Sequence, residues 1–226
     1  MHQLAASFIL GYHGCDKAVG ERILEGEPFK QSNNDYDWLG PGIYFWEANP
    51  LRGLDFAREA KKRRNSNIKK PFVIGAVISL GLCLDLTTTA GIEQVRAAHK
   101  SLVEFAAAAG RKLPENASEG LLRALDCAVI QMVHTIRNDR GDQPIDSVKG
   151  VFIEGRPVYD GSGFYEKTHI QIAVRNPDCI KGVFRVPQAQ LRSIDNLKLR
   201  RRRKLRRRRR TLAPRPAPEP PRSRLM

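Results

Sequence analysis

The sequence has few of the features that would place a protein in a membrane or outside the cell. No apolar run approaches the roughly 20 residues of a membrane-spanning helix, and residues 1–10 lack the basic start and the long apolar core of a signal peptide. The four cysteines, Cys15, Cys83, Cys127 and Cys179, form no C-x-x-C pair and lack zinc-site spacing. We therefore expect a cytoplasmic protein with reduced cysteines, no membrane contact and no metal site.

Most of the chain also has little net charge, although the formal total is +15. Residues 192–226 hold 15 Lys and Arg against 2 Asp and Glu, and residues 198–210 alone hold 11 Lys and Arg. A block of like charge with few apolar residues cannot bury enough surface to fold. We predict that residues 1–191 form one domain and that residues 192–226 form a disordered tail rich in Arg and Pro.

The first 191 residues alternate between strand-like and helix-like segments, as in an α+β fold. Short β-branched or aromatic runs predict strands at residues 8–12, 43–46, 148–153, 169–174 and 180–186, and the apolar stretch 72–86 predicts a strand pair or one bent strand. Apolar spacing predicts helices at residues 17–24, from residue 49 onward, at about 92–109 and at about 118–137. The last two helices carry no cluster of reactive groups, so we interpret them as packing elements.

The stretch Gly40–Trp46, Gly-Pro-Gly-Ile-Tyr-Phe-Trp, combines a tight turn with a short aromatic strand. Two glycines around a proline leave a bent backbone that a flat ligand can approach. On a strand, Tyr44 and Trp46 point to one face and Phe45 to the other, so one face can belong to the core and the other to a pocket. The alternative is an ordinary turn that leads into a core strand.

Two other segments place polar side chains at strand positions. His13 lies at the end of a predicted strand beside Gly14, where it can face a cleft or be a structural histidine. On the strand 169–174, His169, Gln171 and Ala173 share one face, and the other face is wholly apolar. We expect the polar face to point outward or into a cleft.

In this order, the segments resemble the ADP-ribosyltransferases, in the branch that includes the poly(ADP-ribose) polymerases and the diphtheria-toxin-like enzymes. The segments that carry the resemblance are Tyr12-His13-Gly14, Gly40–Phe45 with the helix that holds Ala57, residues 72–84, and the strand Gln171–Asn176 in the place of the strand with the catalytic glutamate. The His-Ile-Gln-Ile strand and the following Arg-Asn-Pro also resemble a group of small bacterial proteins. The resemblance covers roughly residues 7–90 and 150–187. It implies a split β-sheet core in which the helices at about residues 92–137 are an insertion.

The resemblance also implies a reaction and a set of binding residues. These enzymes use NAD as a co-substrate, break its nicotinamide–ribose bond and pass ADP-ribose to an acceptor on a macromolecule. By family role, His13 would hydrogen-bond the adenine-side ribose, the backbone of Gly14 would hold the nicotinamide amide and Tyr44 would stack on the nicotinamide ring. Tyr12 and Gly42 belong to the same two motifs. The chain has no Rossmann fingerprint, and NAD in a cleft between strands does not need one.

One position departs from the family pattern, because Gln171 stands where the glutamate is expected. A carboxylate about 4 Å from the developing cation is worth at most roughly 4 kcal/mol at an effective dielectric of 20, or on the order of a thousandfold in rate. This favours transfer of a single unit over poly-ADP-ribosylation. His169 could act as a general base and Glu166 could reach the site from its loop. Alternatively, His169 is a surface strand residue and Glu166 a solvated carboxylate.

We therefore expect a mono-ADP-ribosyltransferase that modifies protein or nucleic acid, in a toxin or phage-defence setting. One alternative is a binding module that keeps the NAD cleft without turnover. Another is a basic nucleic-acid-binding protein, since the tail Lys198–Arg210 is expected to contact nucleic acid or an acidic partner. RNA binding by such a tail would weaken with salt, with a log–log slope of about −0.7 per phosphate contact.

Overall fold

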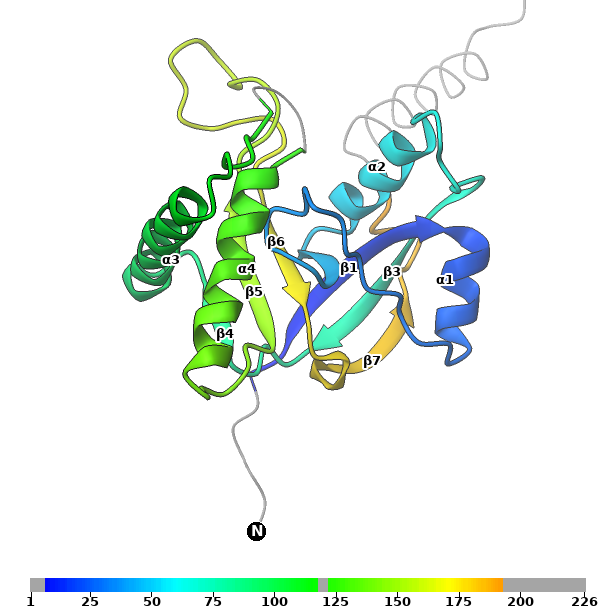
Figure 1. Cartoon of the computed structure of the whole chain (residues 1–226). Coiled ribbons are helices and arrows are strands. Elements are labelled where there is room, and N and C mark those ends of the chain that lie inside the picture. The colour runs from blue at the N-terminus through cyan, green and yellow to red at the C-terminus, as the bar shows by residue number, and fades with distance from the viewer. Residues whose placement is uncertain (1–6, 118–121, 193–226) are drawn as a thin grey trace, which may run out of the picture. The chain divides into compact units, whose positions relative to one another are not determined.

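The computed structural model describes residues 7–117 and 122–192, which form a seven-stranded mixed sheet with four α-helices (Figure 1). The elements are β1 (Ile9–Asp16), α1 (Lys17–Leu24), β2 (Ile43–Glu47), α2 (Pro50–Lys61), β3 (Pro71–Ile78), β4 (Cys83–Asp85), α3 (Thr89–Ala108), α4 (Ala124–Asp139), β5 (Ser147–Phe152), β6 (His169–Val174), a 3-10 turn (Pro177–Cys179) and β7 (Ile180–Arg185). The predicted α+β class is confirmed. The predicted disorder of the tail concerns residues that lie outside the described part, apart from Arg192. In the described part of the chain, no helix is long and apolar enough to cross a membrane.

The strand order is β4-β5-β6-β2-β1-β3-β7, with a parallel β4–β5 pair and antiparallel pairs elsewhere. β1 pairs with β3 along its whole length, from Ile9 to Asp16. With β2, in contrast, β1 pairs only at Gly11 and Tyr12. The sheet therefore separates between β1 and β2 beyond Tyr12, and this gap positions the candidate site.

Side-chain caps explain where three helices begin. Asp16 accepts a hydrogen bond from the backbone N–H of Ala18 at the start of α1. Asn49 caps α2, which has Pro50 in its first turn, and the Thr88 hydroxyl accepts from the first turn of α3. Each cap satisfies a backbone donor that the helix itself leaves unpaired.

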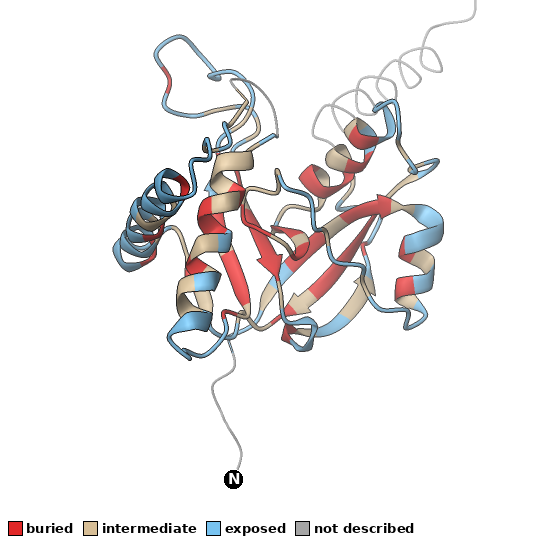
Figure 2. Cartoon of the chain, viewed as in Figure 1, coloured by how far each residue is buried: buried red, intermediate tan, exposed pale blue. Residues whose placement is uncertain are grey.

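Both faces of the sheet are buried at its centre (Figure 2). On one face, α3 and α4 pack on β4, β5 and β6 through a cluster that includes Leu84, Ala98, Ile130, Val148 and Ala173. On the same face, α2 packs on β1 and β3 through Leu54, Tyr12 and Val73. The opposite face has its own cluster, made by Ile43, Phe45, Ala76, Ile78, Ile172 and Val174. The site lies on the first face, between the two groups of helices.

Two sequence expectations differ from the structure. The helix predicted from residue 118 begins at Ala124, and residues 118–121 are outside the described part. The polar face of β6 was expected to point outward or into a cleft. Gln171 does line a cavity, whereas His169 on the same face is 6% exposed and does not line it. Alternation fixes which residues share a face, but the covering elements decide whether that face meets solvent.

Ala48, directly after β2, has a φ of 50°, the only positive φ at a non-glycine residue in the described part. This left-handed conformation places a Cβ close to the following carbonyl and costs about 1–2 kcal/mol. We expect Ala48→Gly to raise the free energy of unfolding by about 0.5–1 kcal/mol, since the added entropy of the unfolded glycine offsets part of the relief. Urea unfolding measures the change. A lower free energy of unfolding for Ala48→Gly would contradict the assignment of backbone strain to Ala48.

His134 on α4 lies against Arg175, whose guanidinium donates to the ring Nδ1 at 2.6 Å. Burial, followed by the charges of Arg175 and Arg137, lowers the pKa of His134 to about 4. Between about pH 6.5 and pH 4 the unfolded chain therefore binds a proton that the folded protein does not bind. We expect the free energy of unfolding to fall as the pH drops through this window, and His134→Gln to reduce the fall. Urea unfolding at pH 7, 5.5 and 4.5 tests this, and an equal fall in the variant would contradict it.

Candidate functional site

A cavity of about 520 Å³ lies where β1 and β2 separate, bounded by α2, Gln171 of β6 and the segment before β2. Its walls combine five aromatic side chains with polar and cationic ones. Its lining includes His13, Lys30, Ser32, Asp37, Trp38, Gly42, Tyr44, Trp46, Phe56, Arg63 and Gln171. His13, Gly42, Tyr44 and Gln171 were predicted from sequence, and the fold brings these four into one cavity.

His13 lies in the gap between the two strands. Its Nδ1 is 2.8 Å from the carbonyl oxygen of Tyr44, and a carbonyl only accepts, so Nδ1 carries the proton. The ring also packs edge-on against Phe29 and close to Phe45. Burial lowers the pKa of His13, so the neutral ring leaves Nε2 as a hydrogen-bond acceptor for a ligand.

Tyr44 is held in place through its hydroxyl group. The hydroxyl donates to the Gly40 carbonyl at 2.8 Å and accepts from the Leu39 N–H at 3.1 Å. Burial raises the pKa of Tyr44, with a smaller contribution from Asp37. Because Gly40 has a φ of 75°, the turn needs glycine at this position. The phenol is thus fixed by the turn that precedes it, and its ring forms a wall of the cavity.

Gln171 is oriented by Trp38, which the sequence analysis missed. The indole N–H of Trp38 lies 2.5 Å from Oε1 of Gln171. An indole N–H is only a donor, so the amide oxygen must face it and the NH2 group is left for the cavity. The ring of Trp38 can lie here because Gly150 has no side chain, and a Cβ at Gly150 would come within 2.7 Å of it. The cavity therefore meets an amide donor at this position.

Tyr12 is not in the cavity, which corrects its predicted binding role. It is 5% exposed and packs with Leu54 and Val73, edge-on to Phe184. Tyr12 pairs with Trp46 and lies on the same face of the sheet as Trp46 and Tyr44, but α2 and Phe184 cover its ring, and it does not line the cavity. The aromatic ring serves to dock α2 and β7 onto β1.

Gly14 has a structural role that the sequence did not reveal. A Cβ at this position would lie 2.1 Å from the carbonyl oxygen of Gly53 in α2. Gly14 is not among the residues that line the cavity, and its backbone role stays a prediction. The Leu10 carbonyl accepts from Ala48 on the β2 side, and alternation turns the N–H and C=O of Gly14 to the same side, where β2 no longer pairs.

His169 and Glu166, the two predicted helpers of Gln171, do not line the cavity. His169 donates from Nδ1 to the Lys167 carbonyl and packs beside Trp46. Its Nε2 is buried without a partner among the described residues, and burial lowers its pKa. Glu166 is exposed and lies 3.7 Å from the guanidinium of Arg156. Neither residue reaches the cavity in this conformation.

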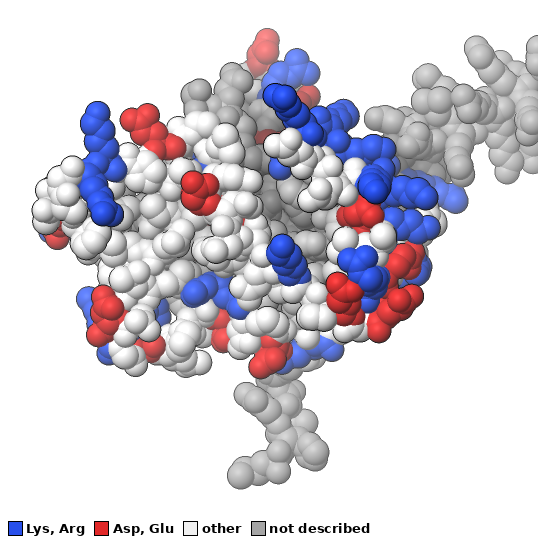
Figure 3. Space-filling view, turned by 45° about the vertical axis from the view of Figure 1, so that its right-hand side comes forward, with Lys and Arg blue, Asp and Glu red and all other residues white. Residues whose placement is uncertain are grey.

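Cationic groups at the cavity come from two places. Lys30 belongs to the segment before β2, and Arg63 follows α2 and lies 5.4 Å from the ring centroid of Phe56. Figure 3 shows Lys and Arg gathered on the α2 side of the molecule. Residues 61–64 are four cations at the end of α2, where Lys and Arg commonly form a solvated helix end, but Arg63 lines the cavity. Their spacing alone gave no sign of this.

An ion-pair network fixes α2 relative to the end of β5. Arg52, 7% exposed, binds Glu154 at 2.5 Å and Glu59 at 3.3 Å. Lys167 bridges the same two carboxylates at 2.9 and 3.1 Å. The Arg52 and Lys167 charges hold the pKa of Glu154 below its usual range despite the opposing effect of burial. The network keeps the wall formed by α2 in place, because separating buried partners is costly.

Comparison with known proteins identifies one partial relative. No family model matches the chain, and no solved structure matches it. A stretch of 67 residues is 34% identical to an uncharacterized protein of Methanocaldococcus jannaschii, and the match covers 30% of this chain and 31% of the archaeal protein. The chain thus matches less than a third of that relative. Among the residues that the structure describes, no group of three or more His, Cys, Asp or Glu could hold a metal ion.

Proposed function

We propose that the protein binds NAD in the cavity between β1 and β2 and transfers ADP-ribose from it to a macromolecular acceptor. One observation carries the proposal. His13, Tyr44 and Gln171 are 31 or more residues apart in the sequence, and all three line one cavity at the point where the sheet separates. These are the positions at which the resemblance to ADP-ribosyltransferases expects the contacts to NAD.

The proposal assigns protein groups to the adenine-side ribose, the nicotinamide and the diphosphate of NAD. A hydroxyl of the adenine-side ribose donates to Nε2 of His13, and the nicotinamide amide bonds the free backbone of Gly14. The nicotinamide ring stacks on Tyr44. Lys30 and Arg63 supply positive charge for the diphosphate. Asp37, fixed by a 2.6 Å bond from Ser32, keeps the segment that carries these contacts in position.

The reaction breaks the bond between C1′ of the ribose and the nicotinamide nitrogen. The electron pair of the bond goes to the nitrogen, which becomes neutral, and C1′ becomes an oxocarbenium ion. An acceptor nucleophile then bonds to C1′ and loses its proton to solvent or to a base on the acceptor. Because Gln171 brings an uncharged amide, the protein contributes through orientation and strain of NAD, and only one unit is transferred.

The test uses the full-length protein, NAD labelled on the adenylate phosphate and a cell extract. Label is expected in protein or nucleic acid, with nicotinamide released in equal amount. His13→Ala and Tyr44→Ala should each lower NAD affinity at least tenfold, since each removes a buried contact. Leu10→Ala, on the same strand but 47% exposed and outside the cavity, is the matched control. Absence of NAD binding to the wild-type protein would overturn the proposal.

The bond between Trp38 and Gln171 favours a second candidate, a module that binds NAD or ADP-ribose without cleaving it. This hydrogen bond directs the NH2 group of Gln171 into the cavity. A hydrogen-bond donor does not stabilise the positive charge that develops on the ribose during cleavage. Saturable NAD binding without nicotinamide release would support this candidate over the transferase.

Nucleic-acid binding by the tail stays a separate prediction, because residues 193–226 are outside the described part. Deletion of all residues after Asn196 should remove affinity for RNA and leave NAD affinity unchanged. Binding of RNA by the shortened protein would contradict the assignment to the tail.

A further inference from the structure

A second cavity, larger than the cavity between β1 and β2, lies on the other side of Trp38, at an open edge of the sheet. β4 pairs with β5 only at Ser147, Val148 and Lys149, whereas β5 continues to Phe152. The Lys149 carbonyl accepts from the N–H of Leu86 on the β4 side. Backbone groups alternate along a strand, so the N–H and C=O of Val151 point to this same side. In the described part of the chain, no strand pairs with that side beyond Lys149.

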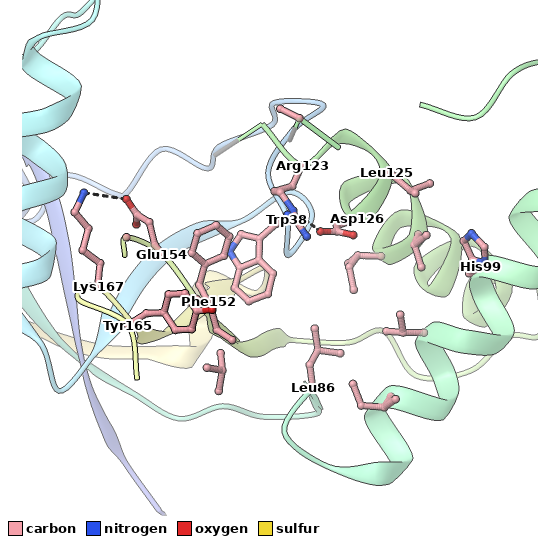
Figure 4. Close-up of a pocket in the computed structure, with 18 of the residues that line it drawn as sticks. Trp38, Leu86, His99, Arg123, Leu125, Asp126, Phe152, Glu154, Tyr165 and Lys167 are labelled. Carbon is pink, nitrogen blue, oxygen red and sulfur yellow. Dashed lines mark hydrogen bonds and ion pairs between the residues drawn. The ribbon is translucent and has the colours of Figure 1, made fainter. Parts of the chain in front are cut away.

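A cavity of about 1150 Å³ lies directly beside this edge, between α3, the start of α4 and the end of β5 (Figure 4). Much of its surface is apolar and comes from helices as well as strands. Leu86, Ile92, Val95, Leu125 and Val129 line it together with Ile153. Trp38 forms part of the wall here and also lines the cavity at β1 and β2.

The rim of this cavity exposes large apolar side chains. Val151 is 45% exposed, Ile153 62% and Ile92 43%. Alternate apolar residues on an unpaired strand end invite pairing with another chain, and proteins usually cover or charge such edges. Here the edge is short and recessed between helices, which restricts pairing to a single extended segment.

The charged residues of this cavity are mostly cationic. Four Lys and Arg line it, Arg96, Arg123, Arg156 and Lys167, against two acids, Asp126 and Glu154. The pairs of Arg96 with Glu93 and of Arg156 with Glu166 have side chains that are 46% to 87% exposed. Exposed pairs are worth little, so these two guanidinium groups can exchange their partners for the carboxylates of a ligand.

We propose that this surface binds an extended polypeptide segment of a partner protein that has apolar side chains at alternate positions and acidic side chains flanking them. The segment adds a strand beside β5 and bonds the N–H and C=O of Val151. Its alternate apolar side chains enter the cavity beside Ile92 and Val129, and the acidic side chains that flank them meet Arg96 and Arg156, which line the same cavity. Main-chain bonds give affinity in such strand addition, and the side-chain pockets give specificity. A helix would leave the edge of β5 unpaired, and the binding does not depend on NAD.

The first experiment selects peptides from a random library displayed on phage, with the immobilised full-length protein as target. Selected peptides are expected to show apolar residues at alternate positions and acidic residues flanking them. One selected peptide is then synthesised in two isomeric forms. Each form carries N-methyl groups on one of the two sets of alternate backbone amides. Strand addition uses only one set, so one isomer should lose at least tenfold in affinity and the other should stay within about threefold. The basic tail is the same in every measurement and does not distinguish the two isomers.

The second experiment compares two substitutions on α3, Ile92→Glu and Val103→Glu. Ile92 lines the cavity, whereas Val103, 40% exposed, does not. Ile92→Glu should weaken the unmethylated peptide at least tenfold, with Val103→Glu equal to wild type and NAD affinity unchanged in both. The proposal would be overturned if the selection enriched no peptide, if the two methylated isomers bound with equal affinity, or if the two substitutions had equal effects. A selected peptide whose apolar residues recur every three or four positions, as on one face of a helix, would also overturn the proposal.

Discussion

Replacement of Gln171 by Glu is expected to raise the rate of nicotinamide release from NAD by up to about a thousandfold. The Trp38 N–H that now binds Oε1 of Gln171 can donate to a carboxylate in the same place. The second carboxylate oxygen then faces the cavity, and its charge stabilises the oxocarbenium ion by at most about 4 kcal/mol. Steady-state release of nicotinamide, measured with saturating NAD, gives the change.

Two variants control for this result. Trp38→Phe should reduce the gain of Gln171→Glu, because it removes the N–H donor that orients the side chain. Gln171→Leu removes the amide without adding charge, so it should not accelerate the reaction. A folded Gln171→Glu protein that binds NAD as tightly as wild type but releases nicotinamide no faster would contradict the assigned position of the ribose.

Gly14→Ala is expected to lower the free energy of unfolding by about 3 kcal/mol or more. The added Cβ would lie 2.1 Å from the Gly53 carbonyl oxygen and 3.0 Å from its carbon. Both atoms are backbone atoms of α2, so the helix must move away from β1, and overpacking of this kind commonly costs 1–3 kcal/mol or more. Urea unfolding measures the loss.

Gly182→Ala on β7 is the matched control for Gly14→Ala. A Cβ at Gly182 meets no atom within 4 Å, and alanine lowers the entropy of the unfolded chain. We expect this variant to be neutral or more stable by up to about 1 kcal/mol. Equal losses at the two positions would contradict the close approach of α2 to β1. Because Gly14→Ala perturbs the fold, it is not a test of NAD binding.

Much of the fold could be predicted from local sequence. Lys17–Leu24 and His169–Val174 were predicted with the bounds that the structure shows, since strong caps and alternation mark them. The first strand was predicted to end at residue 12 but continues to Asp16. Its extra residues pair with β3, and long-range pairing of this kind overrides the local preference of His-Gly-Cys.

The candidate site was less predictable, because its geometry depends on contacts between distant segments. The sequence pointed to His13, Tyr44 and Gln171, and the fold places them in one cavity. It did not point to Trp38, which is 133 residues from the Gln171 it orients and lies in a polar stretch. Nor could alternation show that His169 is buried beside Trp46, since the covering residues come from other elements.

The most direct measurement of the central claim is a titration of the full-length protein with NAD, observed through tryptophan fluorescence excited at about 295 nm. The chain has two tryptophans, Trp38 and Trp46, and both line the cavity between β1 and β2. NAD bound there is predicted to change the emission to saturation with one site per chain, and His13→Ala to shift the midpoint at least tenfold. An unchanged emission, or a midpoint that is the same in His13→Ala, would contradict the assignment of the cavity to NAD.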